Sequence, residues 1–182
     1  GDIISQSVIN LESETTAAQL HNNMIKVGSE LMIDTLNNIF SNTFNTTIQP
    51  VDKKLNKAPK INSQTTRINW SNSLQEINNL VRGLSPYISN NNFLKDKAKC
   101  PGAWFFLELD GERKRIKIIK SKIETSDKNS NFHIDTDNKT YLKIHRKLQS
   151  ISLEFLQMEG KRIMHISEFL LGNPIYSKCR FI

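Results

Sequence analysis

The fold is decided by residues 103–123, AWFFLELDGERKRIKIIKSKI. Asp110-Gly111 stands between two runs rich in apolar and β-branched residues, and Asp-Gly in that setting is a strong β-hairpin signal because both residues tolerate a positive φ. Within 112–123 the basic residues Arg113, Arg115 and Lys117 alternate with apolar ones, so one face of this strand should be charged and the other buried. The stretch therefore predicts an antiparallel hairpin, 103–109 with 112–123.

Further elements on both sides of this hairpin complete the predicted domain. Three more strands are expected at 131–135, 140–146 and 150–157. A helix should run from an N-cap at Ser71 to Gly83, with the apolar stripe Leu74, Ile77, Leu80 and Val81, and a short helix should run from Ser167 to Gly172. The segment 88–100 is polar and is predicted to be a loop. Several short strands with peripheral helices indicate a small antiparallel β-barrel, spanning 67–182.

The first forty residues have a different pattern. Residues 3–11 (IISQSVINL) are predicted to be a strand, and Thr15 or Thr16 could cap the helix that follows. The apolar positions of that helix, mostly three or four residues apart, are Leu20, Met24, Val27, Leu31, Ile33, Leu36 and Ile39. A strand and a helix cannot make a sheet alone, so residues 1–40 are interpreted as the end of an α/β unit in a longer protein. The exposed apolar face of residues 15–40 would favour self-association of an otherwise monomeric chain.

Between these parts, residues 41–66 contain Pro50 and Pro59, are rich in Asn and Thr, and show no period, which is typical of a linker. The predicted class is therefore α+β: a strand–helix remnant at 1–40, a linker at 41–66 and a β-barrel at 67–182.

Composition excludes several classes of protein. The chain of 182 residues is 37% hydrophobic and 24% charged, an ordinary globular mixture, and has no apolar run long enough for a membrane span. Two distant cysteines, Cys100 and Cys179, are read as free thiols in a cytoplasmic protein rather than as a disulfide framework. The four histidines are scattered without metal-ligand spacing, so no metal site is predicted.

The positive charge is concentrated in the second part of the chain. Residues 1–66 hold five Lys and Arg against six Asp and Glu, whereas residues 67–182 hold twenty against twelve, a net charge of +8. A basic module beside a near-neutral one suggests a polyanionic partner. The chain is also rich in Asn, Ile and Lys, as an AT-rich genome would encode, so part of this excess could be compositional.

Four ordered segments resemble the methionyl-tRNA formyltransferase family. They are Gly1-Asp2-Ile3-Ile4; 58–61 (APKI) with 68–70 (INW); 81–86 (VRGLSP) with 101–104 (PGAW); and 156–164 (LQMEGKRIM) with 169–172 (FLLG). The sequence departs from the family at Asn69, where an acidic residue is usual, and in about a dozen additional residues within 88–100.

This resemblance implies an enzyme that moves a formyl group from 10-formyltetrahydrofolate to the amino group of initiator methionyl-tRNA. It also implies a Rossmann-like catalytic domain and an OB-like C-terminal barrel. The family's catalytic Asn, His and Asp would precede Gly1, and Asp2 is only the neighbour of the last of these. We therefore expect no catalytic residue, no resident cofactor and no activity in these 182 residues alone.

Basic residues on the predicted strands, on the linker and in the 156–164 motif are expected to contact the tRNA backbone. The expected set is Lys60, Arg113, Arg115, Lys117, Lys143, Arg146, Lys147, Lys161 and Arg162. For each of them an ordinary solvated strand face or turn is the competing interpretation. Trp70 and Trp104 could be base-stacking platforms, but their apolar neighbours favour core packing.

Two other functions remain open from the sequence. One is a general single-strand nucleic-acid module of the OB type, although few aromatic residues lie among the basic strands. The other is the C-terminal part of a sugar-nucleotide formyltransferase, which shares the folate-binding fold. The 156–164 motif and the basic excess favour the tRNA enzyme over the sugar-nucleotide enzyme.

Overall fold

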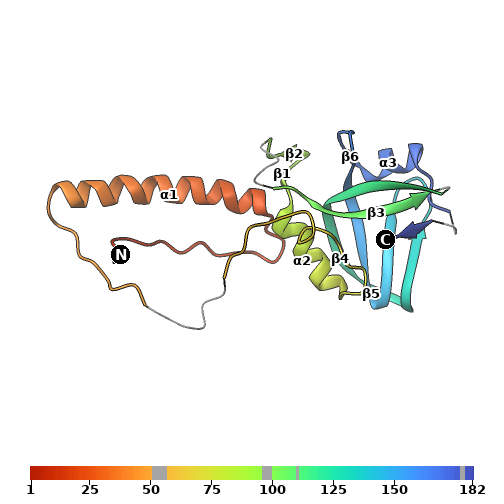
Figure 1. Ribbon diagram of the computed structural model, residues 1–182, viewed down its shortest axis with the longest axis horizontal. Helices are drawn as coiled ribbons and strands as arrows, with labels where there is room; N and C mark the ends of the chain where they lie inside the picture. Colours follow the sequence, from red (N-terminus) through yellow and green to blue (C-terminus); the bar gives the residue numbers. More distant parts are fainter. Residues whose placement is uncertain (51–56, 96–99, 110, 177–178) are drawn as a thin grey trace. The chain divides into compact units, whose positions relative to one another are not determined.

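A computed structural model describes residues 1–50, 57–95, 100–109, 111–176 and 179–182. The chain divides into two compact units (Figure 1). The first consists of Gly1–Thr15 and Gln19–Lys60, and the second of Thr16–Ala18 and Ile61–Ile182. Residues 51–56 of the expected linker lie outside the described residues, so the linker at 41–66 stays a prediction.

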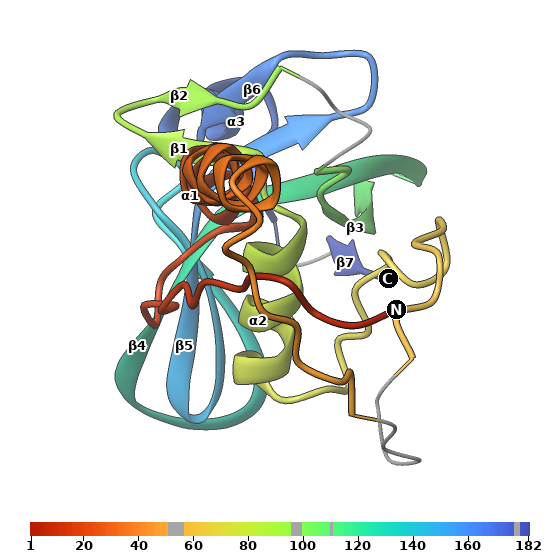
Figure 2. The same cartoon turned by 90° about the vertical axis from the view of Figure 1, so that its left-hand side faces the viewer.

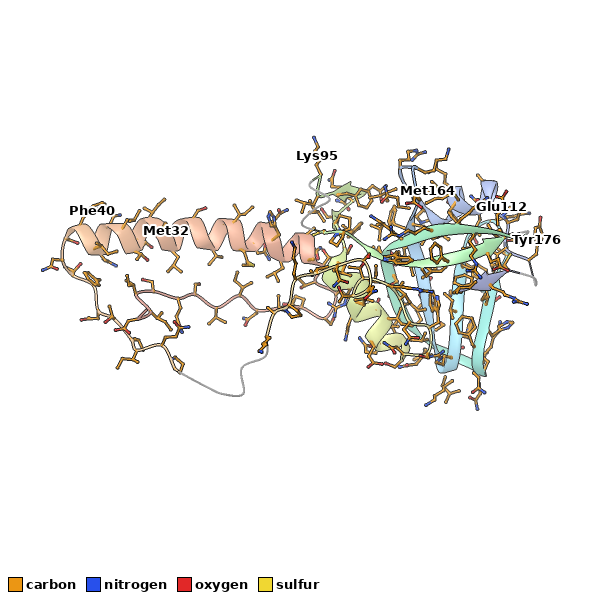
Figure 3. All side chains as sticks on the ribbon, in the orientation of Figure 1. Met32, Phe40, Lys95, Glu112, Met164 and Tyr176 are labelled. Carbon is orange, nitrogen blue, oxygen red and sulfur yellow. The ribbon has the colours of Figure 1, made fainter. Side chains whose placement is uncertain are left out.

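The helix expected in the first forty residues is present as α1 (Ala17–Phe40). Val27 and Leu31, four residues apart on one side, are half-buried. Met32 and Phe40, labelled in Figure 3, are 60% and 84% exposed. The helix therefore carries more apolar surface than its own unit covers.

The strand predicted at 3–11 is wrong. Only Ile3 is paired, in an isolated antiparallel bridge to Thr47 in which each backbone N–H donates to the other residue's carbonyl at 2.8 Å. An Ile-rich segment becomes a strand only where a neighbouring strand offers a ladder, and the described residues give 4–11 none.

The second unit is built on a five-stranded antiparallel sheet in the order β6-β5-β4-β3-β7. Its strands are β3 (Ala103–Leu109), β4 (Glu112–Thr136), β5 (Leu142–Met158), β6 (Ile163–His165) and β7 (Arg180–Phe181). Figure 2 shows β4 and β5 as long, curved strands, with α2 beside them. The sheet supplies most of the buried side chains of this unit.

The central hairpin prediction is confirmed. β3 pairs with β4 from Ala103↔Ile118 to Leu109↔Glu112. Gly111 has a φ of +82°, as the hairpin turn requires, whereas Asp110 lies outside the described residues.

The later strands are longer than predicted. The segments 112–123 and 131–135 belong to one strand, β4, and 140–146 and 150–157 belong to β5. The register of the β4–β5 pairing shifts between Thr125 and Ser130, and again before His133. This irregular pairing lets β4 continue through the polar residues between the two predicted segments.

The expected barrel is not closed. β6 and β7 are the two ends of the strand order, and no backbone pairing joins them within the described part of the chain. Both edge strands are short, three and two residues, so they leave little edge exposed without closure.

The helix α2 (Leu74–Leu84) packs on the sheet with Leu74, Ile77 and Val81 buried, as the stripe predicts. Its N-cap is Ser73, not Ser71. Ser73 Oγ accepts a hydrogen bond from Glu76 N–H at 3.2 Å, and the Glu76 carboxylate accepts one from Ser73 N–H at 2.9 Å. This reciprocal capping box gives Ser73 the advantage over Ser71, whose hydroxyl donates to the Asn69 side chain instead.

The segment 88–100, expected to be a loop, contains a β-hairpin in its described part. β1 (Tyr87–Ser89) pairs with β2 (Asn92–Phe93), and the turn between them is Asn90-Asn91. The φ angles of these two residues are +43° and +62°, the positive pair that a type I′ turn needs and that Asn tolerates. Residues 96–99 lie outside the described residues.

The final helix, α3 (Ile166–Gly172), begins one residue earlier than expected. Its N-cap is His165, whose Nδ1 accepts a hydrogen bond from Ser167 N–H at 3.3 Å. Ile166, Phe169 and Leu170 bury the helix against the sheet.

Candidate nucleic-acid interface

The alternation predicted in β4 is present. Ile116 and Ile118 are fully buried, whereas Arg113, Arg115 and Lys117 lie on the opposite face of the strand. The pairing places Phe106 beside Arg115, and Trp104 and Gln157 on the two sides of Lys117. We call these five residues, Trp104, Phe106, Arg115, Lys117 and Gln157, the outer face.

The guanidinium of Arg115 stacks on Trp104, with Cζ 4.1 Å from the ring centroid. Arg115 Nε is buried and forms no hydrogen bond within the described residues. Trp104 is only 8% exposed, and its indole N–H donates to Ser63 O at 2.9 Å and Thr66 Oγ1 at 3.1 Å. Trp104 is therefore covered and held, which favours packing over base stacking.

Trp70 also packs inside the second unit. Its ring makes edge contacts with Phe105 at 5.2 Å and Phe181 at 5.4 Å between centroids. It is an edge residue of the core cluster rather than a free platform.

Two hollows adjoin Arg115 and Lys117. The smaller, about 170 Å³, is completed by Gln157, Met158, Glu159 and Gly160. The larger, about 310 Å³, is completed by Ile61, Asn62, Ser63, Thr66, Pro101 and Gly102. Arg115 and Lys117 thus line both.

The turn at 158–161 presents the basic pair of the LQMEGKRIM motif. Lys161 N–H donates to Met158 O at 3.0 Å, and Gly160, the third residue of the turn, has a φ of +75°. Glycine is favoured at that position because a side chain there would be strained. Lys161 and Arg162 are both exposed, and Arg162 forms an ion pair with Glu168.

Four other cations of the predicted set either form ion pairs with carboxylates or do not belong to the outer face. Arg113 forms an ion pair with Glu108 at 3.3 Å, and Lys143 with Glu124 at 2.7 Å. Lys147 is exposed with a φ of +54° where β4 and β5 change register, and Lys60 is exposed in the first unit.

Arg146 is engaged by the backbone. Its guanidinium donates to the carbonyl oxygens of Trp70, Asn72 and Asn131, the last from Nε at 3.1 Å. These bonds tie β5 to the segment before α2 and to β4, so Arg146 is built into the fold.

Arg67 belongs near the outer face but is absent from the sequence-based set. Its Cζ lies 5.6 Å from the ring centroid of Trp104 and 5.8 Å from that of Phe106. An isolated parallel bridge joins Arg67 to Trp104, and Ile68 N–H donates to Trp104 O at 2.7 Å. No motif signals this proximity, because the pairing joins distant parts of the chain.

A Ser–His–Asp cluster lies at the far end of β4 and β5 and is structural. His145 Nδ1 is 2.7 Å from Ser126 Oγ, and His145 Nε2 is 3.3 Å from Asp135 Oδ2 without hydrogen-bond alignment. The histidine side chain is 7% exposed, and the Asp135 carboxylate also binds Lys128 Nζ at 2.5 Å and the Tyr141 hydroxyl at 3.2 Å. The Lys128 hydrogen bond holds the pKa of Asp135 below its usual value. The imidazole is buried and the carboxylate is shared with Lys128 and Tyr141, so this cluster joins β4 to β5.

The described residues contain no group of three or more His, Cys, Asp or Glu side chains that could hold a metal ion. No helix in the described ranges is long and apolar enough to cross a membrane.

Comparison with known proteins assigns the family. The model of the formyl transferase C-terminal domain matches residues 60–174, which include the outer face, both hollows and the 158–161 turn. The chain belongs to this family. The formyl transferase C-terminal domain thus ends close to α3 and begins at Lys60, the last residue of the first unit.

Several methionyl-tRNA formyltransferases are similar to this chain over most of its length. The protein of Flavobacterium johnsoniae is 36% identical over 172 residues, covering 94% of this chain and 50% of the relative. The protein of Azobacteroides pseudotrichonymphae is 32% identical and covers 100% of this chain and 54% of the relative. The protein of Phocaeicola vulgatus is 30% identical and covers 94% of this chain and 51% of the relative. The chain therefore spans about half the length of the curated relatives it matches.

Proposed function

We propose that this chain is the tRNA-positioning part of a methionyl-tRNA formyltransferase. In the proposed reaction the amino group of initiator methionyl-tRNA attacks the formyl carbon of 10-formyltetrahydrofolate, the bond from that carbon to N10 breaks, and the amine loses a proton. The family match and the relatives' names support this assignment. The catalytic groups would lie in the part of the relatives that this chain does not span.

The observation that carries the positioning role is the outer face. Arg115 and Lys117 lie between two hollows on a rigid sheet, and the exposed Lys161 follows the turn that borders the smaller one. The two tryptophans are enclosed by protein contacts, so neither offers a free ring to an unstacked base. A face with cations but without these platforms suits phosphates of folded RNA better than bases of a single strand.

The same proposal includes the architecture that the resemblance implies. Residues 1–40 would be the end of a Rossmann-like catalytic domain, and the five-stranded sheet would be an OB-like one. The apolar surface of α1, including Met32 and Phe40, would then be covered by the remainder of that domain. The protein would work in the cytoplasm as a monomer, with 10-formyltetrahydrofolate as co-substrate.

Binding measurements with two ligands test the positioning role. The chain is titrated with initiator tRNA and with single-stranded DNA of similar length, each at several salt concentrations. We expect tighter binding to the tRNA and a logarithm of affinity that falls linearly with the logarithm of salt concentration. Equal binding to both ligands, or no binding at low salt, would contradict the proposal.

The sugar-nucleotide alternative has its own test. If the chain served a sugar-nucleotide formyltransferase, a uridine diphosphate sugar would compete with the tRNA at millimolar concentration. We expect no such competition beyond that of inorganic pyrophosphate at equal ionic strength.

A further inference from the structure

We propose that Arg67, Arg115 and Lys117 form a single phosphate-binding subsite around Trp104, and that this subsite takes one phosphodiester group of the folded RNA. The inference rests on the proposed function and deepens it, because it assigns one anchoring phosphate to three residues. Arg67 is new to the set of predicted contacts.

Two distant segments bring the three cations together. Arg115 and Lys117 are two residues apart on β4, so they share a face of the sheet. Arg67 reaches the same tryptophan from the segment before α2, where backbone hydrogen bonds join Ile68 to Trp104 and Trp104 to Thr66. Backbone pairing, within the sheet for Arg115 and Lys117 and in an isolated bridge for Arg67, therefore fixes the backbone positions of all three residues.

The two guanidinium groups differ in their partners from five other cations of the second unit. Arg113, Lys120, Lys128, Lys143 and Arg162 each form an ion pair with a carboxylate. No ion pair to a described residue is formed by Arg67 or Arg115, although their guanidinium groups lie near the same ring. Two uncompensated cations at one ring repel each other, and a shared anion would remove that cost.

Arg115 is also prepared for such an anion. Stacking on Trp104 restricts the orientation of its guanidinium, so less side-chain entropy is lost on binding. Its Nε–H is buried and unsatisfied within the described residues, an arrangement that costs free energy until an acceptor arrives. A phosphate oxygen is the acceptor that an Arg fork fits best.

The larger hollow is the better place for the phosphate. Arg115, Lys117 and Thr66, the residue before Arg67, line it. Its lining also includes Asn62 and Ser63 and, among the described residues, no acidic side chain, whereas Glu159 lines the smaller hollow. Gly102 keeps this hollow open for Lys117. A Cβ on Gly102 would lie 3.3 Å from Lys117 Cδ, and its φ of +78° already disfavours any other residue.

Nuclear magnetic resonance of arginine Nε–H groups tests the subsite directly. The chain is titrated separately with inorganic phosphate and with initiator tRNA, while the Nε–H signals of Arg67, Arg115 and Arg113 are followed. We expect both ligands to shift the signals of Arg67 and Arg115, and the paired Arg113 to shift much less. Shifts with phosphate alone would overturn the assignment to RNA, and no shift with either would overturn the subsite.

Variants provide a second test through salt dependence. Arg67→Gln and Arg115→Gln should each weaken tRNA binding roughly tenfold and lower the salt slope by about 0.9. Lys122→Gln is the matched control, because Lys122 is exposed on the same strand beyond the register shift. Arg115→Lys keeps the positive charge but loses the planar guanidinium that can bind a phosphate with two hydrogen bonds. This variant should therefore keep the salt dependence of tRNA binding and still bind more weakly.

The outcomes separate the subsite from the proposed function. If the chain binds tRNA but neither Gln variant changes the slope relative to Lys122→Gln, the subsite is wrong and the positioning role stands. If the chain does not bind tRNA, the positioning role fails, and only the phosphate titration then bears on the three residues. Thermal melts of each variant identify any loss of affinity that comes from unfolding.

Discussion

Arg115 and Arg146 lie on neighbouring strands of one sheet, yet their guanidinium groups have opposite surroundings. Arg146 donates to three carbonyl oxygens, whereas Arg115 stacks on Trp104 with its Nε–H unsatisfied in the described structure. Sequence alone places both in one basic set, because spacing shows charge and face but not the hydrogen-bond partners. At the scale of single residues, the partner therefore decides the role.

Removing the side chain of Arg146 should lower stability rather than RNA affinity. In Arg146→Met the carbonyls of Trp70, Asn72 and Asn131 lose their donor, at a cost of about 1–3 kcal/mol in the free energy of unfolding. Urea titrations give this value, and the tRNA affinity of the folded variant should change less than that of Arg115→Gln. A large loss of affinity with unchanged stability would show that Arg146 contacts the RNA.

The turn at 137–141 predicts a dependence of stability on pH. The Asp137 carboxylate accepts hydrogen bonds from the Thr140 hydroxyl at 2.5 Å and from the N–H groups of Thr140 at 2.7 Å and Lys139 at 2.9 Å. These bonds hold the pKa of Asp137 well below its usual value, and the bond from the Thr140 hydroxyl contributes most to that shift. The folded state therefore gains stability from the ionised carboxylate above about pH 4 and loses it as pH falls further.

The variant Asp137→Asn isolates this contribution. It should be less stable than the parent at pH 7, and the difference should shrink as the pH is lowered from about 4 toward 3. Unfolding curves at a series of pH values measure both proteins. A difference that is constant over this range would mean that the carboxylate's charge is not what stabilises the turn.

At the scale of elements, the hairpin of β3 and β4 and the burial pattern of both strands follow from their residues. Strand length does not, because the polar stretch 126–130 lies in β4 between segments that pair with β5, rather than through its own propensity. The strand predicted at 3–11 fails for the converse reason, since its β-forming residues have no ladder to join. The hairpin at 87–93 was missed because Asn90-Asn91 is a weaker type I′ signal than Asp-Gly, since Asn tolerates a positive φ less readily than Gly does.

The capping of α2 can be tested by two serine variants. Ser73→Ala breaks the capping box with Glu76 and should lower the free energy of unfolding by about 1 kcal/mol. Ser71→Ala, two residues earlier, loses only a hydrogen bond to the exposed Asn69 side chain and should cost clearly less. Denaturant titration distinguishes them, and equal losses would indicate that the helix begins at Ser71.

At the scale of the whole molecule, the ordered motifs predict the family, and the charge pattern predicts one basic surface. The position of the basic subsite could not be predicted, because Arg67 meets Trp104 only through a parallel backbone pairing between distant segments. The exposed apolar surface of α1 could be predicted only in part. Met24, Ile33 and Leu36 of the predicted stripe are 56%, 60% and 42% exposed, whereas Met32 and Phe40 are exposed outside that stripe.

The exposed apolar side chains of α1 predict concentration-dependent association. Met32→Lys and Phe40→Ser remove apolar area at 60% and 84% exposed positions, so they should shift the chain toward the monomer without destabilising its sheet. Sedimentation velocity over a range of concentrations measures the association. If the parent chain is monomeric at all of them, the exposed face does not drive association.

Lysine footprinting tests the central claim most directly. The chain is acetylated with and without saturating initiator tRNA, and the modification of each lysine is quantified by mass spectrometry. The account predicts protection of Lys117, which lines the smaller hollow, and of Lys161, which follows Gly160 at its border. It predicts no protection of Lys26 on α1 or of Lys122, which lies on β4 beyond the register shift. Protection of Lys26 or Lys122 with Lys117 and Lys161 still reactive would place the RNA elsewhere on the molecule and contradict the account.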